Sequence, residues 1–167
     1  MPGQWQRVLR HLRHDRGDLR RAFPATVLER IEQAVVDGEL RHGAELRVAI
    51  EASLPLGRVL AGVAARDRAL EVFGSLRVWD TDGNNGVLLY VLLADHAVEI
   101  VADRAAARAV PEEAWRAVTQ ALASAYRGGD FRGGTVAAIE RLADILAQAF
   151  PPGERNPDEL PNRPVML

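Results

Sequence analysis

The stretch from Val87 to Leu93 reads V-L-L-Y-V-L-L and contains no charged residue. An apolar run of this length is typical of a strand that is buried on both faces of a sheet. Such a strand needs one layer of other elements above it and a second layer below it. The run therefore predicts a chain in which helices cover both sides of a small sheet.

Two other segments have the pattern of strands. Residues 45–53 alternate apolar and polar side chains, and residues 98–101 return after a tight turn at 94–97. Apolar periodicity predicts helices at 24–40, 58–76, 111–126 and 134–150. This order predicts an α/β chain folded as a three-layer α/β/α sandwich with a small, mixed, twisted sheet. The first strand should run parallel to the second, and the third strand should run antiparallel to the second.

The 167 residues, of which 48% are hydrophobic, suit a single domain of ordinary size. We expect a basic amphipathic arm over residues 1–21, an α/β/α domain over 22–150 and a disordered Pro-rich tail over 151–167, because the tail lacks any periodicity.

The arm has one apolar helix stripe, formed by Trp5, Val8, Leu9 and Leu12, and carries arginines on its other faces. Two interpretations of this stripe remain open. In one, the arm lies on an anionic membrane or on a partner. In the other, the stripe packs on the domain itself.

Composition excludes several classes of function. A net charge of −2 argues against a nucleic-acid partner. The chain has neither Cys nor Lys, which excludes a thiolate metal site, a Cys nucleophile and a Schiff-base lysine. No apolar run reaches the roughly 18 residues of a membrane-spanning helix, and arginines interrupt any signal-peptide core. The expected location is the cytoplasm, peripheral to a membrane through the arm.

An acidic turn, D-T-D-G-N-N-G over residues 80–86, leads into the apolar run. The second and third strands should form a hairpin, so the start of one lies beside the end of the other, where Asp103 stands. Oxygen ligands are therefore predicted to gather at one sheet edge, from Asp80, Asp82, Asn84, Asn85 and Asp103. Such oxygens suit a hard cation, Ca²⁺ or Mg²⁺.

Known motifs fit this turn incompletely. An EF-hand loop would need Gly at Asn85 and Glu at Val91. A haloacid-dehalogenase phosphatase would use Asp80 as the nucleophile and Asp82 as the general acid, but Asn84 replaces its hydroxyl residue and no Lys or later acidic pair follows. Asp, Asn and Gly also form ordinary turns without any ligand.

The segment W-D-T-D-G-N-N-G-V-L-L-Y-V-L-L-A-D-H-A-V-E-I-V-A-D, residues 79–103, resembles the middle of the TPM domain, and the chain resembles a short bacterial member of that family. Its most specific part is Asn84–Leu88. Further matching pieces are Phe23-Pro24, Ala69–Phe73 and Gly129–Phe131, so the resemblance covers about residues 22–150.

The resemblance implies an α/β/α sandwich, divalent-cation binding in some members, weak acid phosphatase activity in others, and roles in assembling or repairing membrane protein complexes. The chain departs from the family pattern where Ala102-Asp103-Arg104 replaces a G-Y-G sequence, and in lacking the usual secretion signal and carboxy-terminal membrane helix.

The favoured hypothesis is a non-catalytic, TPM-like binding module that binds Ca²⁺ or Mg²⁺ weakly and acts in the assembly or maintenance of a membrane-associated protein complex. Its partner would be a protein, with peripheral membrane contact through the Arg-rich arm. One alternative is a weak metal-dependent acid phosphatase that uses Asp80 or Asp82. The other is a purely structural interaction domain.

Overall fold

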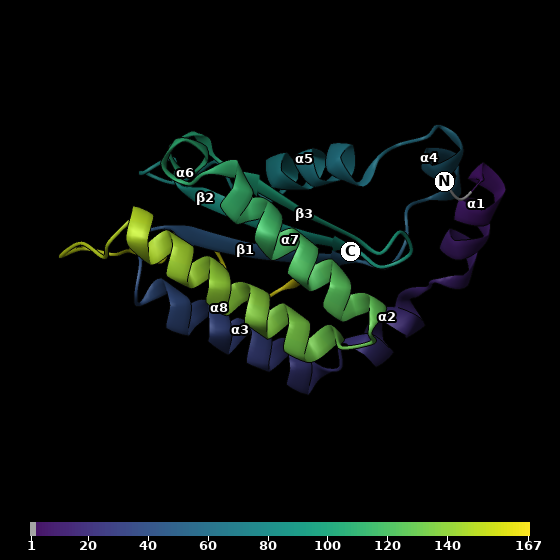
Figure 1. Ribbon diagram of the computed structural model, residues 1–167, viewed down its shortest axis with the longest axis horizontal. Coiled ribbons are helices and arrows are strands. Elements are labelled where there is room, and N and C mark those ends of the chain that lie inside the picture. The colour runs from purple at the N-terminus through teal and green to yellow at the C-terminus, as the bar shows by residue number, and fades with distance from the viewer. Residues whose placement is uncertain (1–2) are drawn as a thin grey trace.

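A four-stranded mixed sheet lies between two layers of helices in the computed structural model, which describes residues 3–167 (Figure 1). The strands are β1 (Glu45–Glu51), β2 (Gly86–Leu92), β3 (Ala97–Ala102) and β4 (Val165–Met166), in the spatial order β3-β2-β1-β4. Strand β2 runs parallel to β1 and antiparallel to β3, which confirms the predicted directions. Strand β4 adds a parallel partner on the free side of β1.

Eight helices surround this sheet in the described part of the chain. They are α1 (Gln4–Arg13), α2 (Arg16–Ala22), α3 (Ala25–Glu39), α4 (Leu56–Leu60), α5 (Ala65–Ser75), α6 (Arg104–Ala109), α7 (Glu112–Arg127) and α8 (Phe131–Ala149). Helices α3, α7 and α8 cover one face of the sheet, and α5 covers the opposite face (Figure 1). Over residues 3–167, no helix is both long enough and apolar enough to cross a membrane.

Strand β2 is buried along its whole length. Its side chains alternate between two hydrophobic clusters: Val87, Leu89 and Val91 pack with α3, α7 and α8, whereas Leu88, Tyr90 and Leu92 pack with α5. Each face of the strand thus has its own helical cover, as the uninterrupted apolar run predicts. The α/β class and the mixed sheet packed between helices are confirmed.

The single helix predicted at 58–76 is two helices, α4 and α5. Gly62 separates them with a φ angle of 75°, in the left-handed region that glycine adopts without steric cost. The apolar periodicity continues across this break, which is why the sequence pattern did not reveal it.

Residues 151–167 are expected to be disordered, but in the structure residues 159–167 lie along the free edge of β1. The guanidinium of Arg47 donates hydrogen bonds to the carbonyls of Pro161 and Arg163, and the Leu167 N–H donates to the Ile50 carbonyl at 2.9 Å. These contacts join residues that are distant in sequence, and no local pattern signals them. Of the predicted arm 1–21, residues 1–2 lie outside the described part, and the rest forms α1 and most of α2.

Candidate metal centre

The turn before β2 and the end of β3 lie at the same edge of the sheet. The Asp103 N–H donates to the Gly86 carbonyl at 2.8 Å, and the Ala105 N–H donates to the Asn84 carbonyl at 2.9 Å. These two bonds extend the β2–β3 hairpin beyond its last paired residues. The amino end of β1 lies at this edge as well, because Glu45 is paired with Gly86. We call this the amino edge.

Three of the five residues predicted as ligands are exposed, namely Asp80, Asp82 and Asn84. The Asp80 carboxylate forms an ion pair with Arg77, with 2.6 Å between Oδ2 and Nη2. Asn84 has a φ angle of 49°, a left-handed conformation that Asn tolerates better than most residues. These three side chains therefore form the solvent side of the turn.

The other two predicted ligands, Asn85 and Asp103, are buried, and each has an oxygen without a hydrogen-bond partner in the described chain. Asn85 Nδ2 donates to the Gly43 carbonyl at 2.7 Å, which leaves Asn85 Oδ1 unpaired. Asp103 Oδ1 accepts the Arg104 N–H and caps α6, which leaves Asp103 Oδ2 unpaired. An unpaired buried oxygen is costly, so each is suited to accept a water or a cation.

A second acidic group at the amino edge was not predicted from the sequence. Glu39 ends α3, Glu45 begins β1, and Asp158 belongs to the tail; one carboxylate oxygen of each lies within 4.8 Å of the other two. We call these residues the acidic trio. Glu39 and Glu45 are buried, with 8% and 3% of their surface exposed, whereas Asp158 is exposed.

Backbone N–H groups hold the two buried carboxylates of the trio in place. Glu39 Oε1 accepts the Leu46 N–H at 2.9 Å. Glu45 Oε2 accepts two tail N–H groups, from Glu159 at 3.2 Å and from Leu160 at 2.9 Å. These bonds engage one oxygen of each carboxylate and fix the direction of both side chains.

Burial dominates the electrostatics of the trio. It raises the pKa of Glu39 to about 8 and the pKa of Glu45 to about 7, against the opposing effect of their backbone hydrogen bonds. The negative charge of Asp158 raises both pKa values further. At neutral pH both side chains therefore hold protons for much of the time, and a divalent cation would favour their ionised forms.

The tail joins the acidic turn to the trio. Glu159 accepts the Asp82 N–H through Oε2 at 2.9 Å, and its own N–H is bound by Glu45. A cavity of about 1000 Å³ lies between turn and tail, with Asp82, Asn85 and Glu159 in its wall. A smaller cavity of about 110 Å³ is lined by all three residues of the trio. The amino edge thus has two oxygen-rich groups linked through Glu159.

The chain is similar to known proteins in sequence and in fold. The sequence model of the TPM domain matches residues 18–145. The NMR structure of the BA42 protein from the psychrophilic bacterium Bizionia argentinensis superimposes with a TM-score of 0.77 at 30% sequence identity, over 87% of this chain and 95% of that one. No curated protein matches the chain.

Proposed function

The chain belongs to the TPM domain family, and we propose that it is a non-catalytic binding module that holds a divalent cation at the amino edge. The observation that carries this proposal is the acidic trio, in which three carboxylate oxygens lie within 4.8 Å of one another. Carboxylate oxygens are the ligands that Ca²⁺ and Mg²⁺ prefer, and Ca²⁺ accepts irregular arrangements of them.

The cation would link parts of the chain that are far apart in sequence. Glu39 and Glu45 flank the loop between α3 and β1, and Asp158 comes from the tail. A bound cation would replace carboxylate repulsion with attraction and hold the tail against the sheet. We propose that this fixes a surface for a protein partner, in the assembly or maintenance of a complex.

Two features support a non-catalytic role for the acidic turn. Asp80, the nucleophile of the phosphatase hypothesis, is exposed and paired with Arg77. The chain also has no lysine to neutralise a phosphoryl group. A phosphatase assay on wild type and on Asp80→Asn tests this point, and we expect equal background activity in both. A metal-dependent activity that Asp80→Asn abolishes would contradict the non-catalytic reading.

Calorimetric titration with Ca²⁺ and with Mg²⁺ tests the cation site. Glu45→Gln and Asp158→Asn each remove a charged ligand, so we expect each to weaken binding about tenfold or more. Glu154→Gln is the matched control, because Glu154 is exposed in the same tail and lies outside the trio. It should bind as the wild type does.

Asp103→Asn distinguishes a cation bound at the acidic trio from one bound at the acidic turn. We expect it to leave the affinity unchanged, because Asp103 is not a member of the trio. Loss of binding in Asp103→Asn together with normal binding in Glu45→Gln would show that the cation binds at the acidic turn. An absence of binding heat in the wild type at millimolar metal would overturn the cation proposal itself.

A further inference from the structure

Helix α1 turns its charged side toward the domain and its apolar side toward solvent. Of its apolar stripe, only Val8 is buried. Trp5, Leu9 and Leu12 are 76%, 56% and 62% exposed. Apart from Val8, the stripe therefore does not pack on the domain, although burial of apolar side chains is the ordinary outcome for an amphipathic helix.

The inward side of α1 is bound to the β2–β3 turn through Asp95. Arg7 Nη2 lies 2.7 Å from Asp95 Oδ2 and also donates to the Val63 carbonyl at 2.7 Å. Arg10 Nε donates to the Ala94 carbonyl at 3.1 Å. Burial would raise the pKa of Asp95, but hydrogen bonds from Arg7 and His11 outweigh it and hold that pKa below its usual value.

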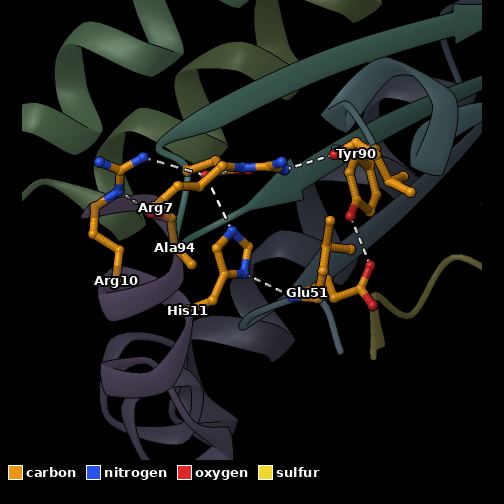
Figure 2. A network of polar contacts seen from close by, with 9 residues as sticks. Arg7, Arg10, His11, Glu51, Tyr90 and Ala94 are labelled. Atoms are coloured by element: carbon orange, nitrogen blue, oxygen red, sulfur yellow. Dashed lines mark hydrogen bonds and ion pairs between the residues drawn. The ribbon is translucent and has the colours of Figure 1, made fainter. Parts of the chain in front are cut away.

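His11 completes this attachment (Figure 2). Its Nδ1 accepts the Leu54 N–H at 2.9 Å, so the neutral ring carries its proton on Nε2, which lies 3.0 Å from Asp95 Oδ1. The helix is thus held by partly buried polar contacts to three loops. Its orientation is fixed before any partner arrives, so docking through its outer face requires no folding step.

Helix α4 lies against α1 and also carries exposed apolar side chains. Gln4 Nε2 donates to the Leu60 carbonyl at 3.0 Å, and the two helices lie together at one end of the molecule (Figure 1). Leu60 and Leu56 are themselves about half exposed. We call this surface the α1–α4 patch; it consists of Trp5, Leu9, Leu12, Leu56 and Leu60.

The charge on α1 is positive, and α2, which follows it, carries further exposed arginines. Helix α1 contains no acidic residue. Arg13, Arg16 and Arg20 are exposed and make no ion pair within the described chain. The nearby Asp15 caps α2 by accepting the Asp18 N–H. A second copy of the chain docked here would bring like charges together, which disfavours self-association through this surface.

From these observations we propose that the α1–α4 patch docks on an anionic lipid bilayer. A tryptophan and several leucines would enter the interfacial region, where an indole ring is favoured. The flanking arginines would lie among anionic headgroups, each adding electrostatic attraction near the surface. The patch lies at the carboxyl ends of β1 and β2, opposite the amino edge, so the proposal does not depend on the cation.

Vesicle flotation of the full chain tests the proposal, with vesicles of phosphatidylcholine alone and of phosphatidylcholine mixed with phosphatidylglycerol. We expect the wild type to float with the anionic vesicles. Leu9→Asp and Leu12→Asp should each reduce partitioning about tenfold or more, because an apolar anchor is lost and a repelled charge is gained. Leu40→Asp is the matched control, since Leu40 is 74% exposed but lies just after α3, away from the patch, and it should float as the wild type does.

Three results would overturn the proposal. One is failure of the wild type to float with anionic vesicles, and another is equal flotation of Leu9→Asp and the wild type. The third is a concentration-dependent dimer in sedimentation that Leu9→Asp abolishes, because the patch would then be an interface between copies of this chain. Circular dichroism of each variant confirms that an exposed substitution has left the fold intact.

Discussion

His42 is a fully buried histidine in the loop between α3 and β1. Its Nδ1 lies 3.0 Å from the Ala44 carbonyl and therefore donates to it, while Nε2 has no partner in the described chain. Burial lowers the pKa of His42 to about 4, and the hydrogen bond to Ala44 opposes this shift only in part. The residue is neutral in the folded protein throughout the physiological range.

This shift predicts a dependence of stability on pH. A depressed folded-state pKa means that the unfolded chain takes up a proton first, so the contribution of His42 to stability is lost as the pH falls from about 6.5 to about 4. The difference amounts to about 3 kcal/mol at the acid end. Urea unfolding at several pH values measures the free energy of unfolding of the wild type and of His42→Gln, and we expect the wild type to lose stability relative to the variant as the pH falls from about 6.5 to about 4. The raised pKa values of Glu39 and Glu45 act in the opposite direction in both proteins, so the difference between them isolates His42. A difference that does not change with pH would contradict the role given to His42.

The start of β2 requires glycine at position 86. A Cβ atom on Gly86 would lie 1.9 Å from the Val78 carbonyl oxygen, so only glycine allows the chain before the turn to pass this close. The Asn-Gly sequence thus has a structural reason independent of any ligand. A turn of this composition is predictable from the sequence, but the close approach of Val78 is not.

We expect Gly86→Ala to destabilise the protein by about 2 kcal/mol or more, because the added methyl group forces the backbone apart. Gly74→Ala is the control. Its Cβ atom would meet nothing within 4 Å in helix α5, so this change should be neutral or stabilise by about 0.5 kcal/mol. Chemical denaturation of both variants measures the contrast, and equal stabilities would refute the role given to Gly86.

Local patterns in the sequence predict the sheet and the hairpin of this protein, but not every contact of its tail. The apolar run of β2 led to the covered sheet, and hairpin geometry placed Asp103 beside the acidic turn. The acidic trio escaped prediction, because Glu45 reads as an ordinary polar position of a strand and Asp158 lies in a tail without periodicity. Only the three-dimensional path of the tail brings them together.

The tail contact has a measurable consequence. The Leu167 amide is bonded to Ile50, and Arg47 holds the preceding carbonyls. We therefore expect Arg47→Met to speed hydrogen exchange at the Leu167 amide while leaving the amides of β2 protected. Arg155→Met, a change at an exposed tail residue, should leave Leu167 as it is in the wild type. Rapid exchange of Leu167 already in the wild type would show that the tail is not bound.

Backbone amide chemical shifts of the full chain during titration with Ca²⁺ report on the proposed cation site residue by residue. The amides bonded to the trio belong to Leu46, Glu159 and Leu160. We predict saturable shifts at these three residues, and we expect Asp158→Asn to need a Ca²⁺ concentration about tenfold higher or more for the same shifts. Shifts confined to residues 80–86 and 103, or no shifts at millimolar Ca²⁺, would contradict a cation site at the acidic trio.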